Sequence, residues 1–192
     1  VPPILSDLGS MNNKIEEATL GGGCFWCLEA VFNRLKGVEL CESGYSGGPN
    51  PNPTYEQVCG GKTGHVEVVR LRYNPEEISF NTLLDVFFTI HDPTTLNRQG
   101  NDVGTQYRSV IFYHNEEQRD LAQACIDRLE ADRSFFSSKI VTAVEPLVNY
   151  YPGEKYHQNY YENNPYQGYC AYVVAPKVEK ATVKFTDLMR KA

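Results

Sequence analysis

Apolar residues recur at helical spacing in two stretches of the chain. Between residues 25 and 36 they occupy positions i, i+3, i+4 and i+7, namely Leu28, Val31, Phe32 and Leu35. This spacing places them on one face of a helix, which Gly37 ends. Further along, Ser79 is a candidate N-cap for a helix through Ile90. Its inward-facing row is Leu83, Leu84, Phe87 and Phe88.

Apolar runs bounded by turn residues predict strands at residues 17–20, 38–45, 65–73, 109–113 and 140–144. Helices are also expected from Asn115 to Ala131 and over residues 181–189. A long loop is expected around Pro51 and Pro53, and a polar loop from Asp92 to Gly104.

The interleaving of strands and helices predicts a single α/β (α+β) domain over residues 1–192. We expect a mixed β-sheet with flanking helices, as a two-layer sandwich of ferredoxin-like type. Residues 1–16 are expected to form an N-terminal tail. Residues 150–192 are expected to form a partly irregular C-terminal segment.

The composition is that of a globular protein with a mild acidic excess. The chain has 18 Lys and Arg against 24 Asp and Glu, a net charge of −6. This balance argues against a nucleic-acid partner, because phosphate binding favours a basic surface. No apolar run has the length of a membrane helix, and the first residues do not resemble a secretory signal. We therefore expect a cytoplasmic monomer without nucleic-acid or membrane partners, although a processed organellar form stays open.

The stretch Gly21-Gly22-Gly23-Cys24-Phe25-Trp26-Cys27 is the strongest local candidate for chemistry. A strand ends in a glycine turn, and Cys24 opens the following helix. Because a helix N-terminus favours negative charge, this position predicts a lowered thiol pKa and a reactive cysteine. Phe25 and Trp26 would form an apolar wall suited to an apolar substrate group. The alternative is that Cys24 and Trp26 are ordinary core residues.

The pair Cys24-x-x-Cys27 leaves two other interpretations open. The pair could act as a general dithiol–disulfide oxidoreductase. It could also bind zinc in a binding module, with Cys59 and His65 completing the ligands, although their spacing is not a standard one. The six cysteines are too sparse for a disulfide scaffold and fit a reducing compartment.

Seven further motifs, in order along the chain, make a family resemblance specific. The segment Gly23–Trp26 resembles the signature of the peptide methionine sulfoxide reductase A family. The resemblance continues, from about Ala18 to Lys184, in residues 44–48, 52–55, 64–67, 92–94, 99–109, 156–158 and 168–170. The family reduces the S epimer of methionine sulfoxide, free or in proteins, to methionine.

The resemblance implies a nucleophile and an acid. Cys24 would attack the sulfoxide sulfur as a thiolate and become a sulfenic acid. Glu67 would protonate the sulfoxide oxygen, which requires a carboxylic acid that stays neutral near pH 7. Its place between Val66 and Val68 fits burial, but an outward, solvated Glu67 is an alternative that alternation along the strand leaves open.

The resemblance also implies the rest of the substrate pocket. Tyr55 and Tyr107 would donate hydrogen bonds to the sulfoxide oxygen. Asp102 would orient the substrate or water in the same pocket. Phe25 and Trp26 would hold the substrate methyl group. No bound cofactor and no metal are expected.

Resetting the enzyme needs a second thiol. Cys170, in a Gly-Tyr-Cys turn of a flexible tail, resembles the family's resolving cysteine. Cys27 replaces a glycine of many members and is close enough along the helix to bond Cys24. We expect a relay in which Cys27 and Cys170 take part in an order the sequence leaves open. Thioredoxin, or dithiothreitol in vitro, would then reduce the final disulfide. The remaining cysteines are expected to be structural, namely Cys41, Cys59 and Cys125.

Overall fold

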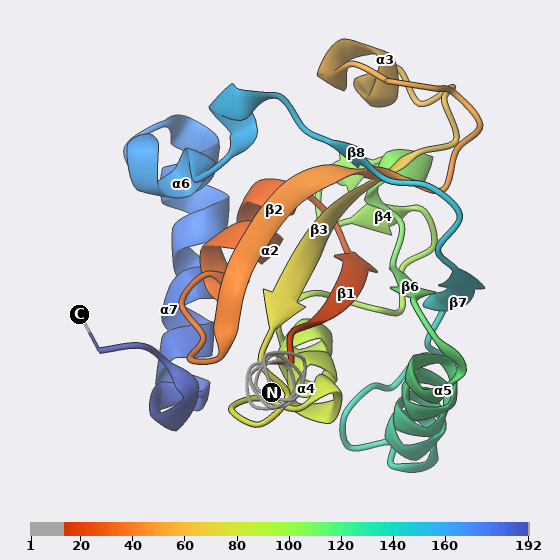
Figure 1. Cartoon of the computed structure of the whole chain (residues 1–192), viewed down its shortest axis with the longest axis vertical. Helices are drawn as coiled ribbons and strands as arrows, with labels where there is room; N and C mark the ends of the chain where they lie inside the picture. The colour runs from red at the N-terminus through yellow and green to blue at the C-terminus, as the bar shows by residue number, and fades with distance from the viewer. Residues whose placement is uncertain (1–13, 192) are drawn as a thin grey trace, which may run out of the picture.

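The computed structural model describes residues 14–191. Its centre is a six-stranded sheet in the order β7-β6-β1-β3-β2-β8 (Figure 1). The four middle strands and two helices follow one another as βαββαβ along the chain. These elements are β1 (Glu16–Gly21), α2 (Phe25–Phe32), β2 (Val38–Ser46), β3 (Val66–Tyr73), α4 (Phe80–Ile90) and β6 (Val110–Tyr113).

Neighbouring strands among these four are antiparallel, which is the ferredoxin-like arrangement. Two short strands extend the sheet at its edges. β7 (Ala143–Pro146) pairs in parallel with β6, and β8 (Tyr151–Pro152) pairs with β2. The parallel pair makes the sheet mixed, so the predicted fold class is confirmed.

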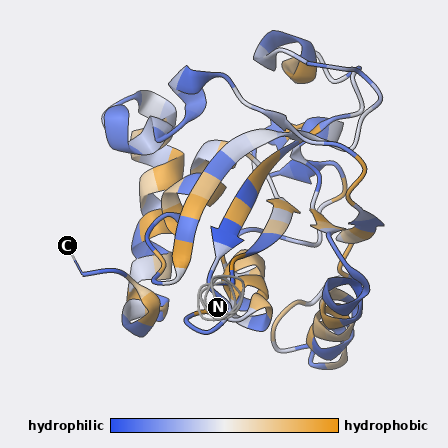
Figure 2. Cartoon of the chain, in the orientation of Figure 1, coloured by the Kyte–Doolittle hydropathy of each residue, from blue (hydrophilic) through white to orange (hydrophobic). Residues whose placement is uncertain are grey.

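The main core lies between one face of the sheet and the helices. Figure 1 shows α2 and α4 behind the sheet, with α7 (Ala175–Lys184) beside them. Apolar colouring is concentrated on the central strands and on α4, whereas the outlying α6 (Tyr160–Asn163) is hydrophilic (Figure 2). Along β3, Val69, Leu71 and Tyr73 alternate onto the helix-covered face. Burial of this face is the largest favourable contribution to folding.

A smaller cluster covers the opposite face of the sheet. It consists of Val66, Val68, Val110 and Phe112. Leu147 and Tyr150, from the segment between β7 and β8, pack against this cluster. The first part of β3 is therefore buried on both faces, which explains its nearly continuous apolar sequence.

Two of the expected loops contain regular structure. The loop after β2 contains α3 (Tyr55–Cys59), which Thr54 begins with a reciprocal capping box to Gln57. The polar loop contains a hairpin of β4 (Arg98–Gln99) and β5 (Asp102–Val103), followed by a 3-10 turn at Thr105–Tyr107. The sequence patterns do not predict the short elements inside these two loops, because short capping and pairing motifs lack hydrophobic periodicity.

The C-terminal part also differs from the prediction. Short 3-10 and α-helical turns at Lys155–His157 and in α6 lead to a π-helix at Cys170–Val174. The π-helix continues directly into α7, which ends at Lys184 before a 3-10 turn at Thr186–Leu188. The last helical region therefore begins near Cys170, and not at residue 181 as the sequence predicts. The predicted turn at Cys170 is also wrong, because Cys170 is the first residue of the π-helix.

The other helix and the chain ends agree with the sequence more closely. α5 (Glu116–Ala131) begins at the predicted N-cap, Asn115, whose side chain accepts a hydrogen bond from the Gln118 N–H. Of the expected N-terminal tail, residues 1–13 lie outside the described residues, and Glu16 already belongs to β1. Within residues 14–191, no helix is both long enough and apolar enough to span a bilayer.

Candidate active site

The glycine turn places Cys24 at the start of α2. Cys24 is the N-cap residue, with extended backbone geometry and no capping hydrogen bond from its own side chain. Gly23 has φ +90°, and a Cβ atom there would lie 2.7 Å from Cγ of Gln99. Its N–H donates to the Tyr107 carbonyl oxygen at 3.2 Å. Only glycine fits this approach, so the turn fixes Cys24 against the loop that carries Tyr107.

The Cys24 thiol is buried, with 7% of the residue exposed. Burial raises its pKa well above the usual range, and its hydrogen bond to Cys27 raises the pKa further. The Trp26 N–H at the helix start lowers the pKa, but by less than burial raises it. The prediction that the helix N-terminus lowers the pKa of Cys24 is therefore wrong in this structure, because desolvation outweighs the helix dipole.

Glu67 faces the same helix start from β3. Its side chain is on the helix-covered face and is 1% exposed, so the outward alternative is wrong. Oε1 of Glu67 accepts a hydrogen bond from the Phe25 N–H at 3.0 Å. Burial raises the pKa of Glu67 to about 8, although this hydrogen bond favours the charged form. The carboxyl group is consequently neutral in most molecules at pH 7.

Aromatic side chains from three segments surround Phe25 and Trp26. Tyr160 stacks on the Trp26 indole with a centroid distance of 3.8 Å and an interplanar angle of 4°. The indole N–H donates to Nδ1 of His157 at 3.0 Å. Tyr55 stacks near Phe25 at 6.2 Å and lies 4.3 Å from the His157 ring. Contacts from the C-terminal segment thus fix the orientation of Trp26.

Two tyrosine hydroxyls share the surroundings of Cys24 and Glu67. Burial raises the pKa of both Tyr55 and Tyr107, and the charges of Glu67 and Cys24 raise it further. Both phenols therefore stay protonated, and can donate hydrogen bonds, across the physiological range. A carboxyl group, a thiol and two phenols consequently converge at the start of α2.

A second row of polar groups starts at Cys27, one turn into α2. Cys27 Sγ lies 4.0 Å from the Tyr169 hydroxyl, which donates to Oδ2 of Asp102 at 2.5 Å. The pKa of Cys27 is lowered to about 7, first by the hydrogen bond from Cys24 and then by the positive charge of Lys177. Of the two thiols of this pair, Cys27 is therefore the more acidic.

Cys170 follows Tyr169 and is fully buried within the main core. Burial raises the pKa of this thiol, and the nearby Cys27 charge raises it further. Cys170 therefore lies in a helical segment packed into the core, and not in the turn that the sequence predicts. Cys41 lies in β2 and Cys125 in α5, as predicted, whereas Cys59 is exposed at the end of α3.

Comparisons with known proteins agree with this geometry. The family model described as peptide methionine sulfoxide reductase matches residues 16–188. The peptide methionine sulfoxide reductase MsrA of Polynucleobacter asymbioticus is 54% identical over 175 residues, which are 91% of this chain and 92% of the relative. The chain belongs to the peptide methionine sulfoxide reductase A family. It is therefore an oxidoreductase of methionine sulfoxide.

Solved structures share the fold of this chain. Reduced Mxr1 from Saccharomyces cerevisiae matches with a TM-score of 0.72 and 39% identity, over 81% of this chain and 89% of that chain. Mxr1 in complex with Trx2 matches with a TM-score of 0.50 and 28% identity, over 76% and 84% of the two chains. Mxr1 has thus been observed bound to Trx2.

The zinc alternative finds no support in the structure of this reductase. His65 uses Nδ1 to accept from the Gly48 N–H at 3.1 Å, and Nε2 contacts the Asn50 carbonyl oxygen at 2.6 Å. In the described part of the chain, no three His, Cys, Asp or Glu residues form a group that could hold a metal. Cys59 and His65 therefore do not complete a ligand set with Cys24 and Cys27.

The structure of this reductase A brings together every residue that the sequence singled out for the pocket. These are Cys24, Phe25, Trp26, Cys27, Tyr55, Glu67, Asp102 and Tyr107. Cys170 lies near Cys27 but in the core. Sequence reasoning missed His157, Tyr160, Tyr169 and Lys177. The first and third of these lie in motifs that carry the family resemblance, which was the available signal.

Proposed function

We propose that this reductase acts on methionine-S-sulfoxide, free or in proteins, with Cys24 as nucleophile and Glu67 as acid. The observation that carries this proposal is the neutral carboxyl of Glu67. Its pKa is about 8, and the Phe25 N–H fixes it at the helix start that Cys24 opens. The sulfur–oxygen bond of a sulfoxide breaks with difficulty unless the oxygen is protonated. A buried, protonated acid beside a thiol therefore suits oxygen transfer.

The first step transfers the oxygen atom from methionine sulfoxide to Cys24. Cys27, with its lower pKa, is the thiolate of the pair and accepts the hydrogen bond of the Cys24 thiol. As the Cys24 sulfur attacks the sulfoxide sulfur, its proton passes to Cys27, and Glu67 protonates the oxygen. The sulfur–oxygen bond breaks, methionine leaves, and Cys24 holds a sulfenic acid, so sulfur is reduced in the substrate and oxidised in the enzyme.

The walls of the pocket suit the S epimer. Phe25 and Trp26 offer an apolar seat for the methyl group, and Tyr55 and Tyr107 offer phenol donors for the oxygen. Asp102, which accepts a hydrogen bond from the Tyr169 hydroxyl, would orient the substrate or water. The opposite epimer would place its methyl group against the phenols and its oxygen against the indole.

The second step restores the thiol. We expect Cys27 to attack the Cys24 sulfenic acid first, because it is adjacent and acidic, which forms a disulfide and releases water. Cys170 would then exchange with this disulfide after the C-terminal segment has moved. Thioredoxin would reduce the final disulfide, as the Mxr1–Trx2 complex supports.

Mass spectrometry of a single turnover tests this assignment. The reduced protein is mixed with one equivalent of methionine sulfoxide and no reductant, and thiols and disulfides are then mapped. We expect stoichiometric methionine and an early Cys24–Cys27 disulfide. Unchanged thiols in folded, reduced protein would contradict the proposal.

Two variants separate the roles of the thiols. Cys24→Ser is expected to form no methionine, because the nucleophile is lost, while its circular dichroism spectrum stays unchanged. Cys27→Ser is expected to release methionine more slowly, because the acceptor of the Cys24 proton is lost, and to retain the sulfenic acid longer, which a dimedone adduct reports. Methionine production by Cys24→Ser would exclude Cys24 as the nucleophile.

A further inference from the structure

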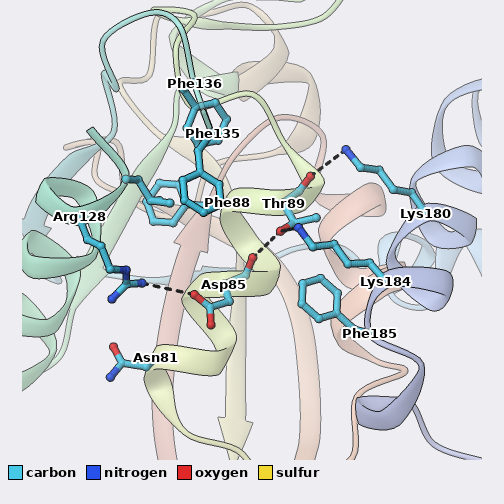
Figure 3. Close-up of a pocket in the computed structure, with 11 residues that line it drawn as sticks. Asn81, Asp85, Phe88, Thr89, Arg128, Phe135, Phe136, Lys180, Lys184 and Phe185 are labelled. Atoms are coloured by element: carbon cyan, nitrogen blue, oxygen red, sulfur yellow. Dashed lines mark hydrogen bonds and ion pairs between the residues drawn. The ribbon is translucent and has the colours of Figure 1, made fainter. Parts of the chain in front are cut away.

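A groove lies over α4, between α5 and α7, on the helical side of the molecule (Figure 3). Its volume is about 660 Å³. Phe88, 4% exposed, forms part of its floor, and Phe135, 57% exposed, stands at its edge. Lys180 and Lys184 reach across from α7 towards Thr89 on α4 (Figure 3). The groove thus combines an apolar floor with a cationic wall.

A second cavity of about 460 Å³ continues this groove towards the active site. The two share Phe88, Phe135 and Lys180 among their lining residues. At the far end of the second cavity are Lys177, whose charge lowers the pKa of Cys27, and Gln99.

The β4–β5 hairpin separates this far end from the active site. Gln99 on β4 pairs with Asp102 on β5, so one strand of the hairpin borders the cavity and the other borders the site. Gln99 also packs under Gly23. The groove therefore ends beside the residues that carry the chemistry.

The charge of the groove is opposite to that of the whole molecule. Four basic side chains line the two cavities, namely Arg128, Lys177, Lys180 and Lys184. Two acidic ones face them, and both are engaged: Asp85 lies 3.6 Å from Arg128, and Asp92 accepts from the Thr94 N–H at 2.9 Å. The chain as a whole carries −6. Because Arg128 and Asp85 offset each other, the three α7 lysines and Asp92 leave a net positive charge along the groove, which attracts an anion.

We propose that this groove binds an acidic segment of an oxidised protein next to its methionine sulfoxide. The inference rests on the proposed function and specifies the class of protein substrate. Lys177 to Lys184 span about 10 Å of helix, at ~1.5 Å per residue. An extended chain of about three residues has the same length, so several carboxylates of one segment can meet the lysines together.

Peptide kinetics test the proposal in the unmodified enzyme. One peptide carries methionine sulfoxide flanked on both sides by a short glycine spacer and a run of glutamates. A second has glutamines in place of the glutamates, and free methionine sulfoxide is the third substrate. We expect the lowest KM for the glutamate peptide, and we expect added salt to raise that KM alone, because salt screens exposed charges.

Charge reversal locates the effect. The double variant Lys180→Glu/Lys184→Glu is expected to raise KM for the glutamate peptide about fivefold or more, with free methionine sulfoxide unaffected. The matched control is Lys14→Glu/Arg72→Glu, which makes the same charge change at exposed positions that do not line the groove. The control should leave all three KM values unchanged.

The alternative outcomes are distinct. An equal KM for glutamate and glutamine peptides in the unmodified enzyme would overturn the proposal. So would a groove variant that changes KM for thioredoxin but not for the acidic peptide, since the groove would then bind the reductant. If either result is found while free methionine sulfoxide is still reduced, only the groove proposal fails and the proposed function stands. If the unmodified enzyme does not reduce free methionine sulfoxide, the proposed function itself is refuted.

Discussion

The carboxyl group of Glu67 illustrates how one position in a strand determines a chemical state. Strand alternation turns Glu67 towards α2, on the same face as Val69 and Leu71. Burial is the largest influence on its pKa, and the nearby charges of Asp102 and Cys27 act in the same direction, so the proton is retained to about pH 8.

A pH profile of single turnover tests the role of Glu67. We expect methionine formation to slow as pH rises through about 8, because the acid loses its proton. Glu67→Gln should lower the rate about 100-fold or more at neutral pH and remove this limb of the profile. Rapid-quench measurements between pH 6 and pH 9.5 report both effects. The exposed Glu39→Gln serves as the control. If the rate of Glu67→Gln still falls as pH rises through about 8, the titration belongs to another group.

The orientation of Trp26 depends on His157, whose Nε2 is buried without a hydrogen-bond partner. His157→Phe keeps a ring but removes the acceptor of the indole N–H. We expect KM for methionine sulfoxide to rise severalfold, with a smaller effect on the maximal rate. Trp26 is the only tryptophan of the chain, so its fluorescence reports the loss of this hydrogen bond directly. His114→Phe is the control, because His114 is also partly buried but lies far from Trp26. An unaltered fluorescence spectrum in His157→Phe would show that His157 does not position Trp26.

At the scale of elements, the C-terminal segment carries the side chains that surround Trp26 and also the candidate resolving thiol. Cys170 is buried, so its reaction requires the π-helix at Cys170–Val174 to leave the core. We expect amide hydrogen exchange over residues 168–174 to be faster in the oxidised protein than in the reduced protein. Exchange in α4, measured by mass spectrometry in the same samples, should not change. Equal exchange of residues 168–174 in both states would argue against movement of this segment.

Hydrophobic periodicity predicted the elements that bury a continuous face. α4 and α5 begin at the expected N-cap residues, Ser79 and Asn115, because capping and periodicity act within a few neighbouring residues. The helix from Cys170 to Lys184 was largely missed, since only Cys170, Val174 and Ala181 of it are fully buried and tertiary packing selects its conformation. Short elements such as α3 depend on one capping box and leave no periodic signal.

In the active site, too, features set by neighbouring residues could be predicted and features set by tertiary packing could not. The position of Cys24 at a helix start could be predicted locally, whereas its pKa could not, because burial depends on segments far along the chain. Tyr169 and His157 reach the site from more than 100 residues away. Their roles follow from contacts that one sequence alone does not contain.

At the scale of the whole molecule, two buried carboxyl groups link stability to pH. Burial raises the pKa of Glu67 to about 8 and that of Glu29 to about 7, from an ordinary value of 4.5. Between these limits the folded protein binds more protons than the unfolded chain, so the free energy of unfolding falls as pH rises from about 4.5 to about 7.

Replacing both acids should flatten this dependence. Glu29→Gln/Glu67→Gln removes two titrating groups, each of which contributes at most about 1.4 kcal/mol per pH unit. We expect the double variant to gain stability relative to the original protein as pH rises towards 7, in urea unfolding monitored by circular dichroism. A constant difference between the two proteins across this range would show that the carboxyl groups titrate normally.

The C-terminal segment contributes both to the surroundings of Trp26 and to the resolving step, which has a consequence for the order of events in turnover. His157, Tyr160 and Tyr169 build the surroundings of Trp26, and Cys170 follows the last of them directly. Under the proposed function, the movement that delivers Cys170 also dismantles the seat for the substrate methyl group. The enzyme would then alternate strictly between two half-reactions. Methionine sulfoxide in excess would not compete with thioredoxin, because the oxidised enzyme would lack the seat for the methyl group. Such ping-pong behaviour gives parallel lines in double-reciprocal plots.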